Sequence, residues 1–195
     1  MAKKTEARRA DLRNRLIDIA QAWIAEDGLT RIKARPLAAE AGCAVGAIYN
    51  VFGDLNDLVM EVNARTFKQL GQDVGEKGQD PDLEPLDALT QLAVGYLHFA
   101  QGHPRAWRTL FELSLTDDME VPEWYRTELR QLFSYIARPV ARLDPSLSEK
   151  EIGMLTRGLF SAVHGIVSLG LEKRISGVPE QHLEDIVRLV LKRLA

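Results

Sequence analysis

The sequence has one cysteine and no long apolar run, and each scarcity narrows the class of protein to which it can belong. Because Cys43 has no second cysteine to pair with, an internal disulfide is excluded, as expected in a reducing compartment. No stretch of about 18 uninterrupted apolar residues exists, so we predict no membrane span. The N-terminus is charged throughout and lacks the apolar core of a secretory signal; it reads MAKKTEARRADLRNR. We therefore expect a cytoplasmic protein with no membrane partner.

Groups that bind metals or carry out catalysis are also scarce. The chain has no HExxH motif, no Walker loop and no cysteine cluster. The histidines do not have the spacing of metal ligands; they are His98, His103, His164 and His182. The sequence therefore predicts no metal site and no cofactor, and we expect no enzymatic activity.

The net charge of −3 hides an uneven distribution along the chain. Residues 1–53 carry nine Lys and Arg against six Asp and Glu, a balance of +3, whereas residues 54–195 have a balance of −6. Within residues 1–15, six basic side chains stand against two acidic ones. Such an arm can lie along phosphates or reach into a minor groove. The alternative is a solvated, disordered terminus.

Apolar residues recur with helical spacing along the whole chain, which predicts an all-α protein of about nine helices. Loops are expected at 71–85 and 115–121, and Pro139 is expected to kink or interrupt its helix. Ser148 and Glu151 match a capping box at the start of another helix. The expected helices cover about 10–27, 34 onward, 45–52, 54–73, 85–101, 104 onward, 122–143, 148–174 and 179 onward.

The most informative segment is residues 37–58, which read LAAEAGCAVGAIYNVFGDLNDL. Gly42 follows a short apolar run and can take a positive φ just past a helix end. A second short helix follows, so the segment predicts a helix-turn-helix unit whose second helix can enter the major groove of DNA. Within the turn, Cys43 either packs as a small apolar residue or acts as a redox sensor near a helix N-terminus.

This segment resembles the DNA-binding signature of the tetracycline-repressor (TetR) family. The resemblance is carried by Leu37-Ala38, Ala41-Gly42, Gly46-Ala47-Ile48-Tyr49, Phe52 and Leu58. A weaker motif at residues 162–167, AVHGIV, is similar to the His-Gly segment in the ligand-binding domain of one TetR subgroup. The resemblance implies a helix-turn-helix DNA-binding domain at 1–53 and a ligand-binding and dimerisation domain at 54–195.

The resemblance also implies a function. It implies a homodimeric, sequence-specific transcriptional regulator, a repressor released by a hydrophobic or aromatic small-molecule effector. Its DNA partner would be a double-stranded operator with an inverted repeat, because two recognition helices read both halves of a palindrome. The alternative is a helical ligand-binding protein with weak or lost DNA binding.

The predicted recognition helix needs one packed and one exposed face. Ile48 and Phe52 are four residues apart and are expected to face inward. Tyr49 resembles the family's tyrosine that donates its hydroxyl to a phosphate, and Asn50 can pair with an adenine edge or a phosphate. Alternatively, Tyr49 is an ordinary half-buried tyrosine and Asn50 a polar surface residue. The predicted DNA-binding set is Lys33, Arg35, Ala44, Val45, Gly46, Ala47, Tyr49 and Asn50.

Four positions depart from the family pattern. The family usually has Ser or Thr at Ala44, often His or Tyr at Val51, frequently Lys at Leu55, and commonly a Thr or Ser cap at Lys33. Three of these changes remove phosphate-binding groups, and each lost contact lowers DNA affinity and the salt dependence of binding. Lys33 and the basic N-terminus offer compensation.

Two further sets of residues are predicted in the larger domain. In the family this region encloses an effector pocket, and its aromatic residues are candidates for the pocket wall or for the core. The predicted effector-binding residues are Trp107, Phe111, Phe133 and His164. A face of small residues near 158–165 suits a four-helix dimer interface, or else packing within one chain. The predicted interface residues are Gly158, Leu159, Ala162, Gly165, Ile166, Leu169, Ile186 and Val190.

Overall fold

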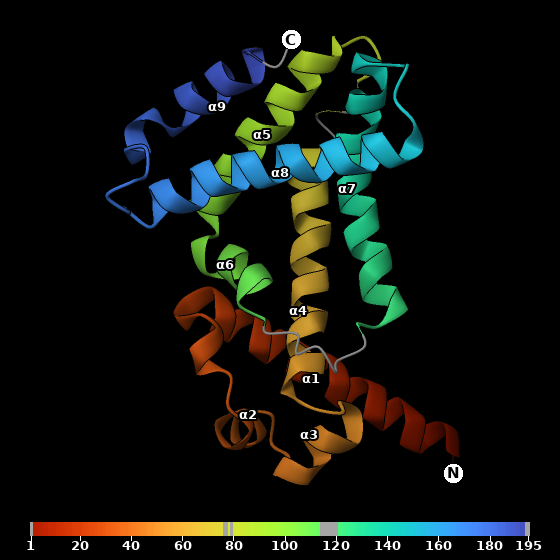
Figure 1. The fold of residues 1–195 in the computed structure, drawn as a ribbon. Coiled ribbons are helices and arrows are strands. Elements are labelled where there is room, and N and C mark those ends of the chain that lie inside the picture. The colour runs from red at the N-terminus through yellow and green to blue at the C-terminus, as the bar shows by residue number, and fades with distance from the viewer. Residues whose placement is uncertain (1, 76–77, 79, 114–120, 194–195) are drawn as a thin grey trace. The chain divides into compact units, whose positions relative to one another are not determined.

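The structure, a computed structural model, describes residues 2–75, 78, 80–113 and 121–193 (Figure 1). These residues form α-helices, short 3-10 and π turns and connecting loops, with no strand among them, which confirms the all-α fold. The α-helices are α1 (Ala2–Asp27), α2 (Ala34–Glu40), α3 (Val45–Val51), α4 (Leu55–Leu70), α5 (Pro85–Gly102), α6 (Pro104–Glu112), α7 (Glu123–Leu143), α8 (Glu149–Leu171) and α9 (Leu183–Lys192).

Contacts divide the chain into two compact units. Unit 1 comprises residues 1–66 and 103–125, and unit 2 comprises residues 67–102 and 126–195. Unit 1 therefore holds α1, α2, α3 and α6, and unit 2 holds α5, α8 and α9, while α4 and α7 contribute residues to both. The functional boundary between residues 53 and 54 stays a prediction.

Unit 1 is built around one face of α1. Leu16, Ala20 and Trp23 recur at helical spacing on this face, and all three are buried. The same core takes in residues of α2, α3 and α4, among them Leu37, Ile48 and Leu58. Burying each such aliphatic side chain contributes about 1.5–3 kcal/mol, so the short helices α2 and α3 are held by this core.

Two helix starts are capped by side chains, and the second of these caps is predicted by the sequence. At α4, the Asp54 carboxylate accepts from the Asp57 N–H at 2.9 Å, while the Asp57 carboxylate accepts from the Gly53 N–H at 2.8 Å. At α8, the Ser148 N–H donates to Glu151 Oε2 at 2.8 Å and the Glu151 N–H donates to Ser148 Oγ at 3.4 Å. The predicted capping box is therefore confirmed, and it satisfies donors that a helix start leaves unpaired.

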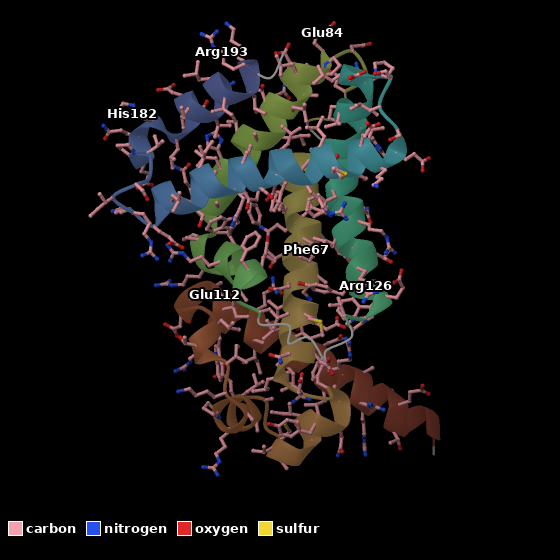
Figure 2. The ribbon with its side chains drawn as sticks, in the orientation of Figure 1. Phe67, Glu84, Glu112, Arg126, His182 and Arg193 are labelled. Carbon is pink, nitrogen blue, oxygen red and sulfur yellow. The ribbon has the colours of Figure 1, made fainter. Side chains whose placement is uncertain are left out.

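Unit 2 has α5 as its central helix, packed against both α8 and α9 (Figure 1). Leu89, Ala93 and Leu97 of α5 are buried, as are Leu183 and Val187 of α9. In Figure 2, His182 and Arg193 mark the two ends of α9. Arg142 of α7 donates to the carbonyl oxygens of Pro81 and Leu83, at 3.0 and 2.7 Å, which holds the turn before α5.

Among the described helices, α8 is the one long and apolar enough, by length and composition, to cross a membrane. Its best 18-residue window has a mean hydropathy of 1.3, and 22% of that window is buried in the chain. The core helix of a soluble protein passes the same test, so this is weak evidence for a membrane span. The expectation of no membrane partner stays a prediction.

Several element bounds differ from the prediction. Helix α1 begins at Ala2, because its first residues are mostly Ala, Lys, Glu and Arg, which favour helix. Residues 71–75, where the expected helix to about 73 overlaps the expected loop, form a π turn that continues α4. Helix α7 runs through Pro139 to Leu143 without interruption, so the chain tolerates the missing hydrogen bond there. The predicted loop at 115–121 falls almost wholly outside the described residues.

Helix α8 ends at Leu171, three residues before the predicted end, because the chain turns at Lys173. Lys173 has φ +53°, a left-handed conformation that a non-glycine residue rarely adopts. Its N–H donates to the Gly170 carbonyl at 3.1 Å, and the Arg174 N–H donates to the Leu169 carbonyl at 3.0 Å. This pair of bonds is a Schellman motif, which closes the helix.

Candidate nucleic-acid interface

The turn between α2 and α3 is closed by hydrogen bonds that require a left-handed residue. Gly42 has φ +66°, which confirms the predicted positive φ. Its N–H donates to the Ala39 carbonyl at 3.2 Å, and the Cys43 N–H donates to the Ala38 carbonyl at 2.9 Å, again a Schellman motif. Cys43 packs against the core of unit 1, as the apolar interpretation expects. The turn therefore sets the angle at which α3 leaves α2.

Helix α3 has the two faces that the sequence predicts. Ile48 is fully buried and Phe52 nearly so, which confirms that these two side chains face inward. On the other side, Tyr49 is 48% exposed and Asn50 is exposed. A short helix thus presents a phenol and a carboxamide to solvent while its opposite face is fixed by the core.

The predicted DNA-binding residues fall into two groups by exposure. Val45 and Ala47 are half-buried, and Val45 packs against the core of unit 1, so it is only partly available to a ligand. The rest are exposed; they are Lys33, Arg35, Ala44, Gly46, Tyr49 and Asn50. Lys33 and Ala44 are the N-cap residues of α2 and α3, and neither side chain forms a capping hydrogen bond. Both helix starts therefore leave backbone donors open to a phosphate.

A shallow depression of about 370 Å³ lies beside Lys33 on unit 1. Its other lining residues are Asp27, Thr30, Arg31 and Pro36. The Arg31 guanidinium lies over the Trp23 ring, 4.7 Å from the centroid, and its Nε is 3.8 Å from the Asp27 carboxylate. Arg31 is thus held by its own unit, and Lys33 is the cation of this depression for which no ion pair is found among the described residues.

The basic N-terminal segment is helical, so the alternative of a disordered terminus is wrong for residues 2–15. Two of its arginines bind within unit 1, which the sequence analysis missed. Arg13 forms an ion pair with Glu61 of α4, and Arg15 donates to the Ala41 carbonyl at 3.2 Å and pairs with Asp11 at 3.3 Å. The position of Arg13 in the sequence could have indicated this role. Arg13 precedes Leu16 by three residues, which places it beside the buried face of α1.

The candidate effector residues lie in different units. Trp107 and Phe111 belong to unit 1, where their rings meet edge to face with centroids 5.6 Å apart. Trp107 is buried, whereas Phe111 is 45% exposed. Phe133 and His164 belong to unit 2, where both are half-buried. The structure thus brings these residues together in pairs, one pair for each unit.

Phe133 and His164 meet through Phe160, which the sequence analysis did not single out. The Phe160 ring stacks on His164 at 5.6 Å and meets Phe133 edge to face at 5.2 Å. A hydrogen bond of 2.8 Å joins the Tyr96 hydroxyl and His164 Nδ1. Burial lowers the pKa of His164, and the Glu172 charge opposes this only in part. The cluster of Tyr96, Phe133, Phe160 and His164 therefore carries a neutral imidazole at pH 7.

Unit 1 contains a buried polar group that no motif predicted. The Asn63 side chain of α4 is fully buried, and its Nδ2 donates to the Thr109 carbonyl at 3.3 Å. No partner for Asn63 Oδ1 is found among the described residues. Tyr125 is also buried; burial raises the pKa of its phenol, and a hydrogen bond donated by the Asn63 amide group acts in the opposite direction. Only tertiary structure can place an asparagine of α4 beside α6.

The predicted interface residues form a partly open surface on unit 2. Gly158, Ala162 and Leu169 are exposed, Leu159 is buried, and the others are half-buried; these are Gly165, Ile166, Ile186 and Val190. A Cβ built at Gly158 or Gly165 would meet no atom within 4 Å. Met154 and Leu189 on the same two helices are 63% and 50% exposed. Small residues and exposed apolar ones thus share α8 and α9.

Comparisons with known proteins agree with the fold. Residues 89–194 match the family model described as "Tetracyclin repressor-like, C-terminal domain". No curated protein sequence matches the chain. Among solved structures, RolR in complex with resorcinol is similar, with TM-score 0.71, 17% identity, and coverage of 97% of this chain and 90% of that one.

Two more solved structures are similar at low sequence identity. FadR from Bacillus subtilis in complex with stearoyl-CoA has a TM-score of 0.67, 16% identity, and coverage of 91% of this chain and 96% of that one. A TetR transcriptional regulator from Rhodococcus sp. RHA1 has a TM-score of 0.64, 19% identity, and coverage of 92% and 95%. At these identities the likeness concerns the fold.

Proposed function

Because the chain belongs to the tetracycline-repressor (TetR) family of transcription regulators, we propose that it is a homodimeric, sequence-specific DNA-binding repressor released by a small-molecule effector. The observation that carries the proposal is α3, whose Ile48 and Phe52 are buried while Tyr49 and Asn50 face solvent. We assign the chain no catalytic activity.

On DNA, α3 would lie in the major groove as the recognition helix. Asn50 is the residue suited to a bidentate contact with an adenine edge, and Tyr49, Lys33 and Arg35 are suited to phosphates. Ala44, Gly46 and Ala47 are small enough for the backbone of α3 to approach the duplex. Two copies of this unit would read the two halves of an inverted repeat.

We propose a hydrophobic or aromatic effector for unit 2. The neutral His164, held between the Tyr96 hydroxyl and the Phe160 ring, would offer a hydrogen bond inside an aromatic surface. RolR binds resorcinol and FadR binds stearoyl-CoA, so related folds accept both a phenol and an acyl chain. Helix α4 is continuous from Leu55 to Leu70 and contributes to both units, which suits it to transmit the effector signal.

Dimerisation would use α8 and α9. The open surface at Gly158 and Gly165 lets a second helix approach closely, and exposed apolar residues such as Met154 and Leu189 would be buried by it. A face of this kind on an isolated chain favours association.

A second candidate function is a ligand-binding protein with weak or lost DNA binding. It is favoured by Ala44, the N-cap of α3, whose methyl group cannot donate a hydrogen bond to a phosphate where the family usually has Ser or Thr. Selection of random duplex DNA by the purified protein, at low salt and without effector, separates the two. Recovery of an inverted repeat supports the repressor, and recovery of no sequence from a folded dimer supports the second candidate.

The phosphate contacts have their own test. We expect Lys33→Ala to lower the slope of log affinity against log salt by about 0.9, because it removes one positive charge from a phosphate, and we expect Tyr49→Phe in the double variant to lower the affinity further at every salt concentration. The measurement is a salt titration on the selected operator. Glu26→Gln, an exposed change on α1, is the control and is expected to keep the slope. An unchanged slope would mean that Lys33 does not contact a phosphate, and an unchanged affinity on adding Tyr49→Phe would mean that the Tyr49 hydroxyl does not.

A further inference from the structure

Arg13 of α1 contacts two other helical elements of unit 1 at once. Its Nη2 forms an ion pair with Glu61 Oε1 of α4. Its guanidinium also lies over the ring of Phe52, 5.2 Å from the centroid. Both partners are mostly shielded, since the Phe52 residue is 4% exposed and the Glu61 side chain 21%. The guanidinium therefore lies over a ring while it pairs with a carboxylate, a combination that its planar fork makes more readily than a lysine ammonium does.

Phe52 is the residue that ends the recognition helix. It is the C-cap of α3, and its N–H donates to the Ile48 carbonyl at 2.8 Å. A group that fixes the Phe52 ring thus fixes the last turn of α3. Through Arg13, this turn is linked to Glu61 on α4. The link is short, because it consists of one side chain between the end of α3 and the middle of α4.

We propose that Arg13 is a positioning residue that fixes the recognition helix α3 against α4, and that it is not a phosphate contact of the basic N-terminus. This inference rests on the proposed function for its effect on DNA binding. A basic residue of the N-terminal segment would thus act by contacts within the protein and not by contact with DNA. Movement of α4 would reach α3 through the Arg13 guanidinium.

A second ion pair provides a matched control. Arg65 Nη1 of α4 lies 2.6 Å from Asp18 Oδ1 and 2.8 Å from Gln21 Oε1. Both partners lie on α1, so this pair joins α4 to α1 as Arg13 does, without a ring of α3. Its Arg side chain has the same exposure as that of Arg13, 38%. Loss of Arg65 therefore reports what an α1–α4 ion pair contributes by itself.

The variant Glu61→Gln distinguishes the positioning role of Arg13 from a phosphate contact, because the two roles predict opposite changes in DNA affinity. If Arg13 bound a phosphate, Glu61 would compete with DNA for it, and Glu61→Gln would raise the affinity by removing a negative charge. If Arg13 positions α3, Glu61→Gln weakens binding, because the guanidinium loses its anchor on α4. The two roles thus predict opposite results for the same variant.

The first experiment measures affinity for the selected operator across a salt series. We expect Arg13→Gln and Glu61→Gln each to weaken binding about tenfold with the salt slope unchanged, and the double variant to lose no more than one single variant, because the residues act as a unit. Arg65→Gln is expected to stay within about twofold of the parent. Tighter binding by Glu61→Gln, or a slope lowered by about 0.9 in Arg13→Gln, would overturn the proposal.

A conservative variant tests the stacking on Phe52. Arg13→Lys keeps the positive charge and can still pair with Glu61, but lysine has no planar group to cover the ring. We expect it to recover only part of the affinity that Arg13→Gln loses. Full recovery would show that charge alone matters and would contradict a role for Arg13 in holding the end of α3.

A second experiment needs no DNA and keeps the proposal distinct from the proposed function. Amide hydrogen exchange in the full chain should be faster at the end of α3, at residues 48–52, in Arg13→Gln than in the parent, and not faster there in Arg65→Gln. If the parent protein binds no DNA, the proposed function fails while this measurement still decides the inference. Unchanged exchange at residues 48–52 in Arg13→Gln would overturn it.

Discussion

Unit 1 links α1 to α4 by ion pairs outside the apolar core that the two helices share, whereas unit 2 links α5 to α8 by ring contacts. In unit 1 the ties are Arg13 to Glu61 and Arg65 to Asp18, all partly exposed. In unit 2 the ties are Tyr96 of α5 to Phe160 and to His164 of α8, around a half-buried imidazole. Ion pairs fix the orientation of one helix against another but add little to the free energy of unfolding. Ring contacts add more to it, and two rings can pack in more than one geometry. The first kind of contact suits the proposed DNA-reading helix, and the second suits the proposed effector site.

The largest expected effect follows from removing one tie of each kind. Phe160→Ala should lower the free energy of unfolding by about 2–4 kcal/mol, because three neighbouring rings lose their partner. Arg65→Gln should lower it by about 1 kcal/mol or less, since its pair with Asp18 is exposed. Urea unfolding followed by circular dichroism measures both. If both variants lost the same free energy of unfolding, the ring contacts of unit 2 would stabilise no more than the ion pairs of unit 1.

The control for this comparison is Leu189→Ala, in which a 50% exposed side chain of α9 is shortened. It should change the free energy of unfolding by no more than about 0.5 kcal/mol if it is measured on dissociated chains. A larger loss that depends on protein concentration would instead report the dimer interface proposed for α8 and α9.

Each unit has one Schellman motif with a left-handed residue, so the contribution of this residue to stability can be compared between the units. Gly42 ends α2 and Lys173 follows the end of α8, with φ values of +66° and +53°. Gly42→Ala should destabilise the protein by about 1–2 kcal/mol through backbone strain alone, because its Cβ would meet nothing within 4 Å. Lys173→Gly should stabilise it by about 0.5–1 kcal/mol, since the same strain is relieved.

Thermal unfolding of the two variants beside the parent measures these changes. A shift of the same sign in both would mean that side-chain contacts, and not the left-handed backbone, decide the stability of these helix ends. Gly42→Ala is also expected to weaken DNA binding, since this turn sets the direction of α3.

The smallest expected effect is the pH dependence of unit 2. The folded-state pKa of His164 is lowered by burial, so the unfolded chain binds a proton more readily than the folded one. Its contribution to stability is complete above the unfolded value near 6.5 and declines as the pH falls from there to the folded pKa. Urea midpoints at a series of pH values should show this decline in the parent and a shallower one in His164→Asn. The same slope in both would exclude His164 as its source.

Much of unit 1 could be predicted because its signals are local. The positive φ of Gly42 and the inward faces of Ile48 and Phe52 follow from short-range rules of turns and helical spacing, and the structure confirms them. The capping box at Ser148 is local in the same way. The start of α1 at Ala2 was missed, because a charged segment without an apolar stripe gives no periodic signal.

The partners of polar side chains could not be predicted. The pair of Arg13 and Glu61 joins residues 48 positions apart in the sequence. The pair of Asn63 and Thr109 joins residues 46 positions apart. No spacing rule connects such residues. Phe160 was overlooked for the same reason, since its role in the aromatic cluster depends on which helices lie beside α8.

By itself the sequence determined the all-α fold class, the place of the Gly42 turn and of the Ser148 cap, and the family to which the chain belongs. These properties follow from interactions within a few residues, where chain connectivity keeps the partners close. Only the tertiary structure decided that Arg13 faces Phe52 and Glu61, that His164 is half-buried with a hydrogen bond to Tyr96, and that Asn63 is buried. Each depends on contacts between distant segments, and these form only once the helices have packed.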